Sequence, residues 1–124
     1  MAPELANVER SILVVDDEPI IRMNLADFFA DEGYTVHEAD SADEAVEVLT
    51  ANPTIRIVLT DIQMPGSMDG IKLAYYIRER FPPTLLVVAS GAVRPAKSAL
   101  PEHTMFVAKP FDPRFLLEEI ERLT

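Results

Sequence analysis

The stretch ILVVDDEPI, residues 12–20, joins an apolar run directly to three acidic residues. The run from Ile12 to Val15 is typical of a strand that is buried on both faces of a sheet. Asp16, Asp17 and Glu18 follow without a spacer, and three adjacent like charges oppose burial. The stretch therefore predicts a buried strand whose end carries carboxylates to a polar edge of the molecule.

Four further segments have the composition of strands. Residues 55–60 (IRIVLT) and 84–90 (TLLVVAS) are continuous apolar runs like residues 11–15. Such strands are expected where helices cover both faces of a sheet. Residues 34–39 (YTVHEA) alternate more and predict an edge strand, and residues 104–108 (TMFVA) predict the other edge.

Helical patterns separate these strands. Apolar residues recur at helical spacing after Pro19, after Ser41, from Gly70 and after Asp112-Pro113. Gly33 fits the exit of the first helix, Ser41 to Glu44 reads as a capping box, and Pro82-Pro83 ends the third helix. Residues 91–104 contain Pro95 and Pro101, so a short or irregular fourth helix is expected there.

Strands that alternate with helices predict an α/β fold with a parallel sheet. In such sheets ligands bind outside the carboxyl ends of the strands. The residues that end the predicted strands are Asp16 and Asp17, Asp61, Ser90 and Lys109. All of them should project from one edge of the sheet.

Carboxylates that crowd one edge repel one another, and a cation relieves this repulsion. The expected ligands are hard oxygens, which suit Mg²⁺. Ca²⁺ is less favoured because DDE lacks the spacing of an EF-hand loop. The sequence therefore predicts a Mg²⁺ site beside Lys109.

The motifs VVDDE, LTDIQMP, MDG, VVASG and AKPF occur in this order. With them the chain resembles the receiver domain of two-component response regulators, and the resemblance covers residues 12–123. It implies a flavodoxin-like, doubly wound, five-stranded parallel sheet of order 2-1-3-4-5 with helices on both faces. It also implies control by phosphorylation.

The resemblance implies a role for each residue of the acidic edge. Asp61 would be the phosphoacceptor and would attack a phosphohistidine of the partner kinase. Asp17 and Asp61 would bind Mg²⁺ directly, and Asp16 would act mostly through water. The backbone carbonyl of Gln63 would supply another ligand.

The same resemblance assigns roles to residues of the last two strands. Lys109 would pair with Asp61 or with the phosphoryl group, and Ser90 would donate a hydrogen bond to a phosphoryl oxygen. Phe106 would occupy the position of the switching aromatic residue. The Lys109-Pro110 peptide bond is expected to be cis in such domains.

Two segments depart from the family pattern. The stretch DIQMPGSMDG, residues 61–70, has one more residue between MP and MDG than is common, and Gly66-Ser67 can absorb it as a wider turn. Residues 91–104 lie in the face that commonly serves for output. The usual output partner or dimer therefore cannot be assumed for this chain.

The composition of the chain limits the kinds of partner that it can bind. The 124 residues include 11 Lys and Arg against 21 Asp and Glu, which gives a formal net charge of −10. This balance argues against duplex DNA or an anionic membrane as a direct partner. The chain has no Cys, and no apolar run approaches the roughly 18 residues that cross a bilayer. We expect a cytoplasmic protein whose partners are a histidine kinase or phosphotransfer protein and a downstream protein.

We expect residues 1–10 to be an N-terminal tail and residues 11–124 to be a stand-alone receiver domain. Three alternatives remain open at this point. The chain could be an interaction module that acts without phosphorylation, or a receiver fragment of a larger regulator or hybrid kinase. It could also be a Mg²⁺-dependent phosphatase, but Gln63 stands where such an enzyme needs a second carboxylate.

Overall fold

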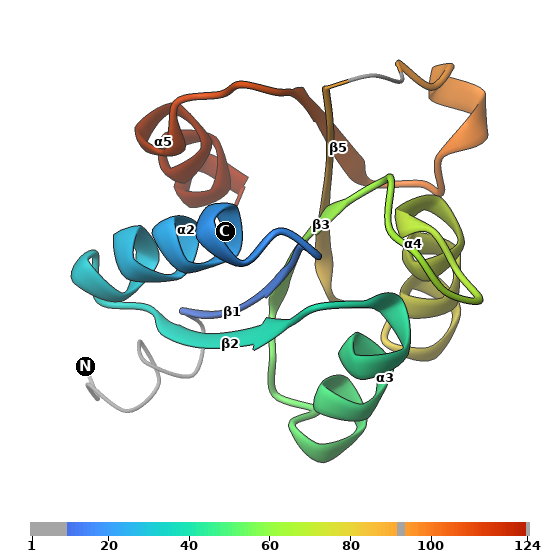
Figure 1. Cartoon of the computed structure of the whole chain (residues 1–124), viewed down its shortest axis with the longest axis horizontal. Coiled ribbons are helices and arrows are strands. Elements are labelled where there is room, and N and C mark those ends of the chain that lie inside the picture. The colour runs from blue at the N-terminus through green and yellow to red at the C-terminus, as the bar shows by residue number, and fades with distance from the viewer. Residues whose placement is uncertain (1–9, 92–93, 124) are drawn as a thin grey trace.

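The computed structural model describes residues 10–91 and 94–123. Its ten elements alternate between strand and helix along most of the chain (Figure 1). In order they are β1 (Ser11–Val15), α2 (Pro19–Asp31), β2 (Thr35–Ala39), α3 (Ala42–Ala51), β3 (Ile57–Asp61), α4 (Gly70–Arg80), β4 (Leu85–Ser90), the 3₁₀ turn η1 (Lys97–Ala99), β5 (Thr104–Ala108) and α5 (Pro113–Leu123).

The five strands form one parallel sheet of order β2-β1-β3-β4-β5. This confirms the predicted fold class, the strand order and both edge strands. β1, β3 and β4 lie inside the sheet, which is why their sequences are continuously apolar. Their carboxyl ends share one edge, because Val15 pairs with Thr60 and Asp61 pairs with Ala89.

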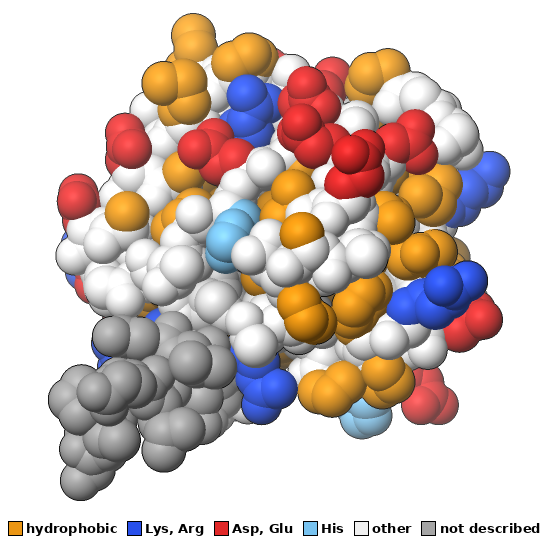
Figure 2. All heavy atoms as spheres, turned by 90° about the horizontal axis from the view of Figure 1, so that it is seen from below, with side chains coloured by type: hydrophobic (Ala, Val, Ile, Leu, Met, Phe, Trp, Pro, Cys, Tyr) orange, Lys and Arg blue, Asp and Glu red, His pale blue; other side chains and the backbone are white. Residues whose placement is uncertain are grey.

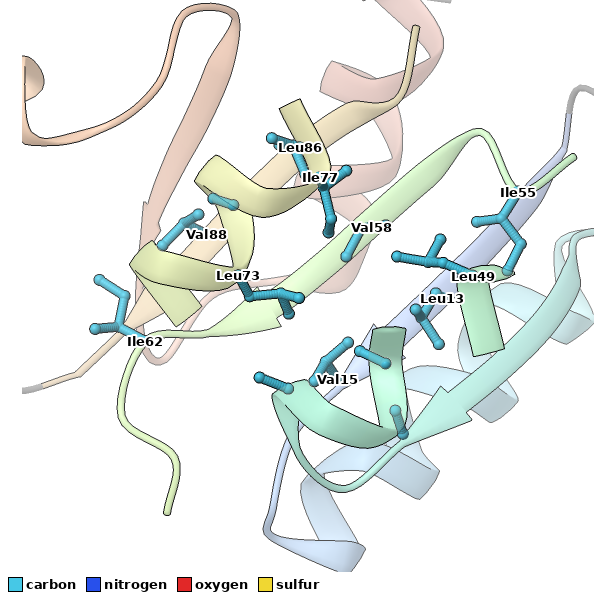
Figure 3. Packing of buried hydrophobic residues seen from close by; sticks show 14 residues of the cluster. Leu13, Val15, Leu49, Ile55, Val58, Ile62, Leu73, Ile77, Leu86 and Val88 are labelled. Atoms are coloured by element: carbon cyan, nitrogen blue, oxygen red, sulfur yellow. The ribbon is translucent and has the colours of Figure 1, made fainter. Parts of the chain in front are cut away.

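Helices cover both faces of the sheet. α2 and α5 lie on one face, and α3 and α4 lie on the other (Figure 1). Successive residues of β1 alternate between the two cores: Ile12 and Val14 pack with α2 and α5, and Leu13 and Val15 pack with α3 and α4. Figure 3 shows side chains of α3 and α4 directed toward the sheet in the second of these cores.

The helix ends follow local sequence signals. The Ser41 hydroxyl accepts a hydrogen bond from the Glu44 amide at 3.1 Å, as a capping box requires. The Glu44 carboxylate accepts in turn from the Asp40 amide at 2.7 Å, one residue earlier than in the standard box. Gly33 follows α2 with a φ of 92°, a conformation that glycine adopts without strain.

The third strand differs most from its predicted bounds, and the predicted strands 34–39 and 84–90 each begin one residue later in the structure. The third strand begins at Ile57 rather than at residue 55 and continues to Asp61. Ile55 is apolar because it is buried in the α3 and α4 core, not because it lies in a strand. The Arg56 amide donates to the Ser11 hydroxyl and to the Ser11 carbonyl, which brings the chain to the sheet just before β3.

The segment between β4 and β5 has no α-helix among its described residues. Only the three-residue turn η1 forms there, which confirms the expected short or irregular fourth helix. Residues 92–93 of this segment lie outside the described residues. Most of the described residues from Arg94 to Ala99 are exposed.

The amino terminus is described only from Arg10 onward, so the expected tail at residues 1–10 falls almost wholly outside the described residues. The Arg10 carbonyl accepts a hydrogen bond from the Thr35 amide at 2.8 Å. Arg10 is therefore attached to the sheet rather than separate from it.

Charge is unevenly distributed over the surface. Figure 2 views the molecule from below relative to Figure 1, the side on which β2 and α3 lie. Acidic side chains gather along one part of this face, and Lys and Arg side chains are scattered in small groups. This arrangement agrees with the net charge of −10.

Candidate metal centre

Three carboxylates meet at the carboxyl edge of the sheet. Asp16 and Asp17 follow β1, and Asp61 ends the neighbouring strand β3. One carboxylate oxygen from each lies within 4.8 Å of the others. Asp16 is buried, and the other two are half-buried. The predicted convergence of residues 16, 17 and 61 is thus present in the structure.

Lys109 brings a cation to the carboxylates. Its Nζ lies 3.0 Å from Asp16 Oδ2 and 3.5 Å from Asp61 Oδ1. The Lys109 amide donates to the Ser90 carbonyl at 3.0 Å, so the side chain starts from a fixed point beyond β5. The Lys109-Pro110 peptide bond is cis, as expected.

The charges of the cluster are not balanced by Lys109 alone. Burial raises the pKa of Asp61, and the charges of Asp16 and Asp17 raise it further, against the opposing effect of Lys109. Burial by itself would lower the pKa of Lys109, but its hydrogen bonds and charge interactions with Asp16 and Asp61 outweigh this and raise that pKa. One ammonium therefore faces three carboxylates.

The donor set fits a hard divalent cation. All three side chains offer carboxylate oxygens, and none offers nitrogen or sulfur. Mg²⁺ favours such ligands and is usually bound through one or two carboxylates while keeping several waters. The half-buried Asp17 and Asp61 leave a side of the cluster open to water. The residues present therefore fit Mg²⁺.

Asp16 is held by contacts that the sequence did not predict. Its Oδ1 accepts a hydrogen bond from the Glu18 amide at 3.0 Å. Its backbone carbonyl accepts from Arg22 Nη1 at 2.7 Å, and Arg22 Nε lies 3.2 Å from Glu38 Oε1. Arg22 thus ties α2 to the ends of β1 and β2. The sequence offers a weak signal for it, an arginine one turn into the helix that follows the acidic run.

Gly70 is a second residue whose importance sequence reasoning missed. A Cβ at this position would lie 2.0 Å from the Asp61 carbonyl oxygen and 2.8 Å from the Ile62 Cα. The Gly70 amide also donates to the Ile62 carbonyl at 2.8 Å. The start of α4 therefore lies against the backbone of Asp61, and only glycine fits there.

The loop between Asp61 and Gly70 contains a glycine with positive φ and is attached to α3. Gly66 has a φ of 108°, and Ser67 Oγ donates to Asp43 Oδ1 at 2.9 Å. This hydrogen bond attaches the loop to α3. Gln63 lies exposed in the same loop, two residues after Asp61. The ligand role of its carbonyl stays a prediction.

Ser90 and Phe106 lie on the neighbouring strands. Ser90 ends β4, is only 2% exposed and pairs in register with Ala108. Phe106 is half-buried against the α3 and α4 core, and the Arg94 guanidinium carbon lies 6.0 Å from its ring centroid. The structure thus places Ser90 at the carboxyl end of β4 and Phe106 in the middle of β5, and their roles in switching stay predictions.

Comparison with known proteins decides the family. The family model described as the response regulator receiver domain matches residues 12–121. The chain belongs to the response regulator receiver domain family. The five residues predicted at the sheet edge all lie within the matched range: Asp16, Asp17, Asp61, Ser90 and Lys109.

Individual relatives agree with this receiver domain assignment. The chain is 38% identical over 114 residues to the response regulator protein FleR of Pseudomonas aeruginosa, a match that covers 90% of this chain and 24% of FleR. It is 36% identical over 118 residues to the transcriptional regulatory protein ResD of Bacillus subtilis, covering 93% of this chain and 48% of ResD. The chain thus spans about half or less of the length of these curated relatives.

A solved structure supports the same fold. The CheY-like response regulator receiver domain protein of Methanospirillum hungatei superposes with a TM-score of 0.80 at 27% identity, and the match covers 92% of each chain. Receiver domains take part in phosphorylation-based signalling with histidine kinases or phosphotransfer proteins, and they generally bind Mg²⁺ at an acidic cluster. Within residues 10–91 and 94–123, no helix has the length and apolar character to cross a membrane.

Proposed function

We propose that this receiver domain accepts a phosphoryl group on Asp61 from a phosphohistidine of a histidine kinase or phosphotransfer protein. The observation that carries this proposal is the meeting of Asp16, Asp17 and Asp61 with the Lys109 ammonium at one edge of the sheet. Phosphoryl transfer needs mainly in-line positioning and positive charge beside the phosphoryl oxygens. This edge supplies a nucleophilic carboxylate and a cation within a few ångströms of it.

In the proposed reaction, an Asp61 carboxylate oxygen attacks the phosphorus atom and forms an acyl phosphate. The bond between phosphorus and the imidazole nitrogen breaks, and the electron pair of that bond stays on the imidazole. Asp17, Asp61 and the Gln63 carbonyl would hold Mg²⁺ directly, and Asp16 would act through water. Mg²⁺ supplies positive charge that stabilises the phosphoryl oxygens.

Lys109 and Ser90 would act on the phosphoryl group itself. The Lys109 side chain is a point charge on a flexible stem, so it can follow a phosphoryl group that arrives at Asp61. Ser90 would donate a hydrogen bond to a phosphoryl oxygen and draw the end of β4 inward. Phe106, on the adjacent strand β5, would change its orientation in response. These movements would signal to a downstream protein.

The test is phosphorylation of the purified chain by acetyl phosphate with Mg²⁺, followed by intact mass. The expected product carries one phosphoryl group in the wild type and none in Asp61→Asn. Asp27→Asn, which changes an exposed aspartate of α2, is the matched control and should be phosphorylated normally. Equal phosphorylation of Asp61→Asn and the wild type would falsify the assignment of Asp61.

An interaction module that acts without phosphorylation is the second candidate. The complete acidic cluster with its lysine favours the phosphoryl acceptor over this candidate. A Mg²⁺ titration separates the two, because the acceptor needs the ion and the module does not. A chain that binds no Mg²⁺ and gains no phosphoryl group from acetyl phosphate would favour the module.

We further propose that residues 11–124 form the receiver unit, that it works in the cytoplasm, and that it acts through protein contacts rather than through DNA or membrane. The acidic surface supports the last point. A phosphotransfer profile against the histidine kinases of the host would identify the donor. Pull-down with the phosphorylated chain as bait would identify the downstream protein.

A further inference from the structure

The segment between β4 and β5 has little packing of its own. Among its described residues, Leu100 is half-buried against the α3 and α4 core and Pro101 is buried, but the residues from Ala96 to Ala99 are exposed. Its internal backbone hydrogen bonds run from the Ala99 amide to the Ala96 carbonyl and from the Leu100 amide to the Lys97 carbonyl. A segment with so few buried contacts needs support from a neighbouring element to stay ordered.

Arg78 of α4 supplies this support through four hydrogen bonds to backbone carbonyls. Its Nη1 donates to Pro82 at 2.7 Å and to Thr84 at 2.9 Å, both in the connection from α4 to β4. Its Nε donates to Glu102 at 3.0 Å and its Nη2 to His103 at 3.1 Å, immediately before β5. One half-buried guanidinium therefore joins the approaches to β4 and β5.

Tyr75 adds a second contact one turn earlier on the same helix. Its hydroxyl donates to the Ala99 carbonyl at 3.1 Å, at the end of η1. Tyr75 and Arg78 are spaced by three residues, so they lie on one face of α4. Together they hold the segment at Ala99, Glu102 and His103. The described part of the segment forms no α-helix of its own that could hold these residues by packing.

The backbone of His103 shows why this support matters. Its φ is 59°, in the left-handed region that a non-glycine residue rarely adopts. Such a conformation persists only where surrounding contacts hold it. The hydrogen bond from Arg78 to the His103 carbonyl is one such contact, and β5 begins at the next residue.

We propose that Arg78, assisted by Tyr75, is a positioning residue that fixes the segment 94–103 and, through it, the start of β5. β5 carries Phe106, and Lys109 follows it, so the hold by Arg78 sets the places of two residues of the proposed switch. Ser90 ends β4, the strand with which β5 pairs. This coupling to the switch rests on the proposed function, whereas the support of the segment does not.

Amide hydrogen exchange tests the support in the unphosphorylated protein. In Arg78→Met, the Ala99 and Leu100 amides should exchange at least about tenfold faster, since hydrogen bonds to a charged group are among the stronger ones. The Val87 amide in β4 should change much less. Arg80→Met, which removes a guanidinium lying over the Tyr76 ring on the same helix, should leave the Ala99 and Leu100 amides unchanged.

Two conservative variants separate geometry from charge. Arg78→Lys keeps the positive charge, but the single lysine nitrogen cannot reproduce the planar guanidinium. The exchange rates of the Ala99 and Leu100 amides should therefore lie between those of the wild type and those of Arg78→Met. Tyr75→Phe should accelerate exchange mainly around Ala99. Unchanged exchange at Ala99 and Leu100 in Arg78→Met overturns the proposal, as does an equal acceleration across the whole sheet.

Addition of beryllofluoride and Mg²⁺, a mimic of the phosphoryl group, tests the coupling. The wild type should show amide shift changes at Ser90 and Phe106, and Arg78→Met should show at most half of them with unaltered Mg²⁺ affinity. Full changes in Arg78→Met would overturn the coupling. A wild type that does not respond would instead contradict the proposed function, and the exchange comparison would still decide the support of the segment.

Discussion

At the scale of single residues, the acidic edge consists of charged side chains at strand ends and of backbone contacts that hold them in place. Asp16, Asp17, Asp61 and Lys109 each follow a recognisable strand, and a parallel sheet brings such residues to one edge. The role of Gly70 depends on how closely α4 passes the backbone of Asp61, which no local pattern encodes. Sequence reasoning therefore finds the charged groups, and the structure adds the contacts that hold them.

Asp61 should destabilise the metal-free protein near neutral pH. Its pKa in the folded state is raised by burial and by its acidic neighbours, so ionisation is harder in the folded chain than in the unfolded one. The contribution of this carboxyl group to the free energy of unfolding is most favourable below its unfolded pKa of about 4, where it is protonated in both states. That contribution is lost as the pH rises through the higher folded pKa. Without Mg²⁺, Asp61→Asn should therefore be more stable than the wild type at neutral pH.

Urea denaturation at several pH values measures this effect. The advantage of Asp61→Asn should shrink as the pH falls and vanish below about 4, where the wild-type carboxyl group becomes protonated in both states. Lys109 keeps its ion pair with Asp16 in the variant. Asp27→Asn is the control and should show no such pH dependence. A metal-free Asp61→Asn that is less stable than the wild type at neutral pH would contradict the prediction.

Gly70→Ala should destabilise the protein although alanine favours helices. A gain of about 1 kcal/mol is usual for glycine to alanine within a helix. Here the added Cβ would lie 2.0 Å from the Asp61 carbonyl oxygen, which is backbone and cannot move without shifting Asp61 itself. We expect a net loss of at least about 2 kcal/mol in the free energy of unfolding, measured in urea, together with weaker Mg²⁺ binding.

Gly91→Ala is the matched control for this substitution. A Cβ at Gly91 would lie 3.6 Å from the Lys109 Cβ, an ordinary van der Waals distance. The free energy of unfolding of Gly91→Ala should differ from that of the wild type by less than about 1 kcal/mol. Equal losses in the two alanine variants would show that the close approach at Gly70 is not the cause.

At the scale of elements, periodicity and turn residues determined most of the fold in advance. The apolar runs of β1 and β4 and the capping signals at Ser41 and Asp112 agree with the structure. The predicted start of β3 at residue 55 was wrong, because Ile55 is buried in the core but does not belong to the strand. Composition cannot distinguish these two reasons for an apolar residue, and only the hydrogen bonds of the sheet do so.

The amino terminus of α3 offers a test at this scale. The Ser41 hydroxyl accepts from the Glu44 amide, and its loss leaves that donor without its cap. Ser41→Ala should lower the free energy of unfolding by about 1 kcal/mol. Ser41→Asp keeps an acceptor at the same place and should retain most of the stability. Thermal denaturation followed by circular dichroism compares them, and equal midpoints for wild type and Ser41→Ala would exclude the cap as a stabilising contact.

At the scale of the whole molecule, order and spacing of motifs predicted the topology better than any single element did. The predicted sheet order was correct because the ordered motifs resemble those of receiver domains, and the predicted edge strands were correct because their sequences are less continuously apolar than those of the inner strands. The support of the segment 94–103 by Arg78 could not be predicted. It joins residues of α4 to carbonyls some 24 residues away, and carbonyls carry no side-chain signature.

Mg²⁺ should stabilise the entire domain if its site joins β1 and β3. A ligand that binds only the folded state adds about 2.7 kcal/mol at a concentration of 100 Kd. The thermal midpoint should rise with MgCl₂, and this rise should be much smaller in Asp17→Asn. NaCl at matched ionic strength is the control for screening of the acidic surface. An equal rise with NaCl would mean that the cation acts through general screening rather than at a site.

The alternation of side chains along β1 and β3 has a mechanical consequence. Leu13 and Val58 are anchored in one hydrophobic layer, and Ile12 and Leu59 are anchored in the other. The strand that ends in Asp61 therefore contacts both helical layers. The phosphorylation proposed for Asp61 would therefore act beside both layers, and its effect would reach the α2 and α5 face as well as the α3 and α4 face.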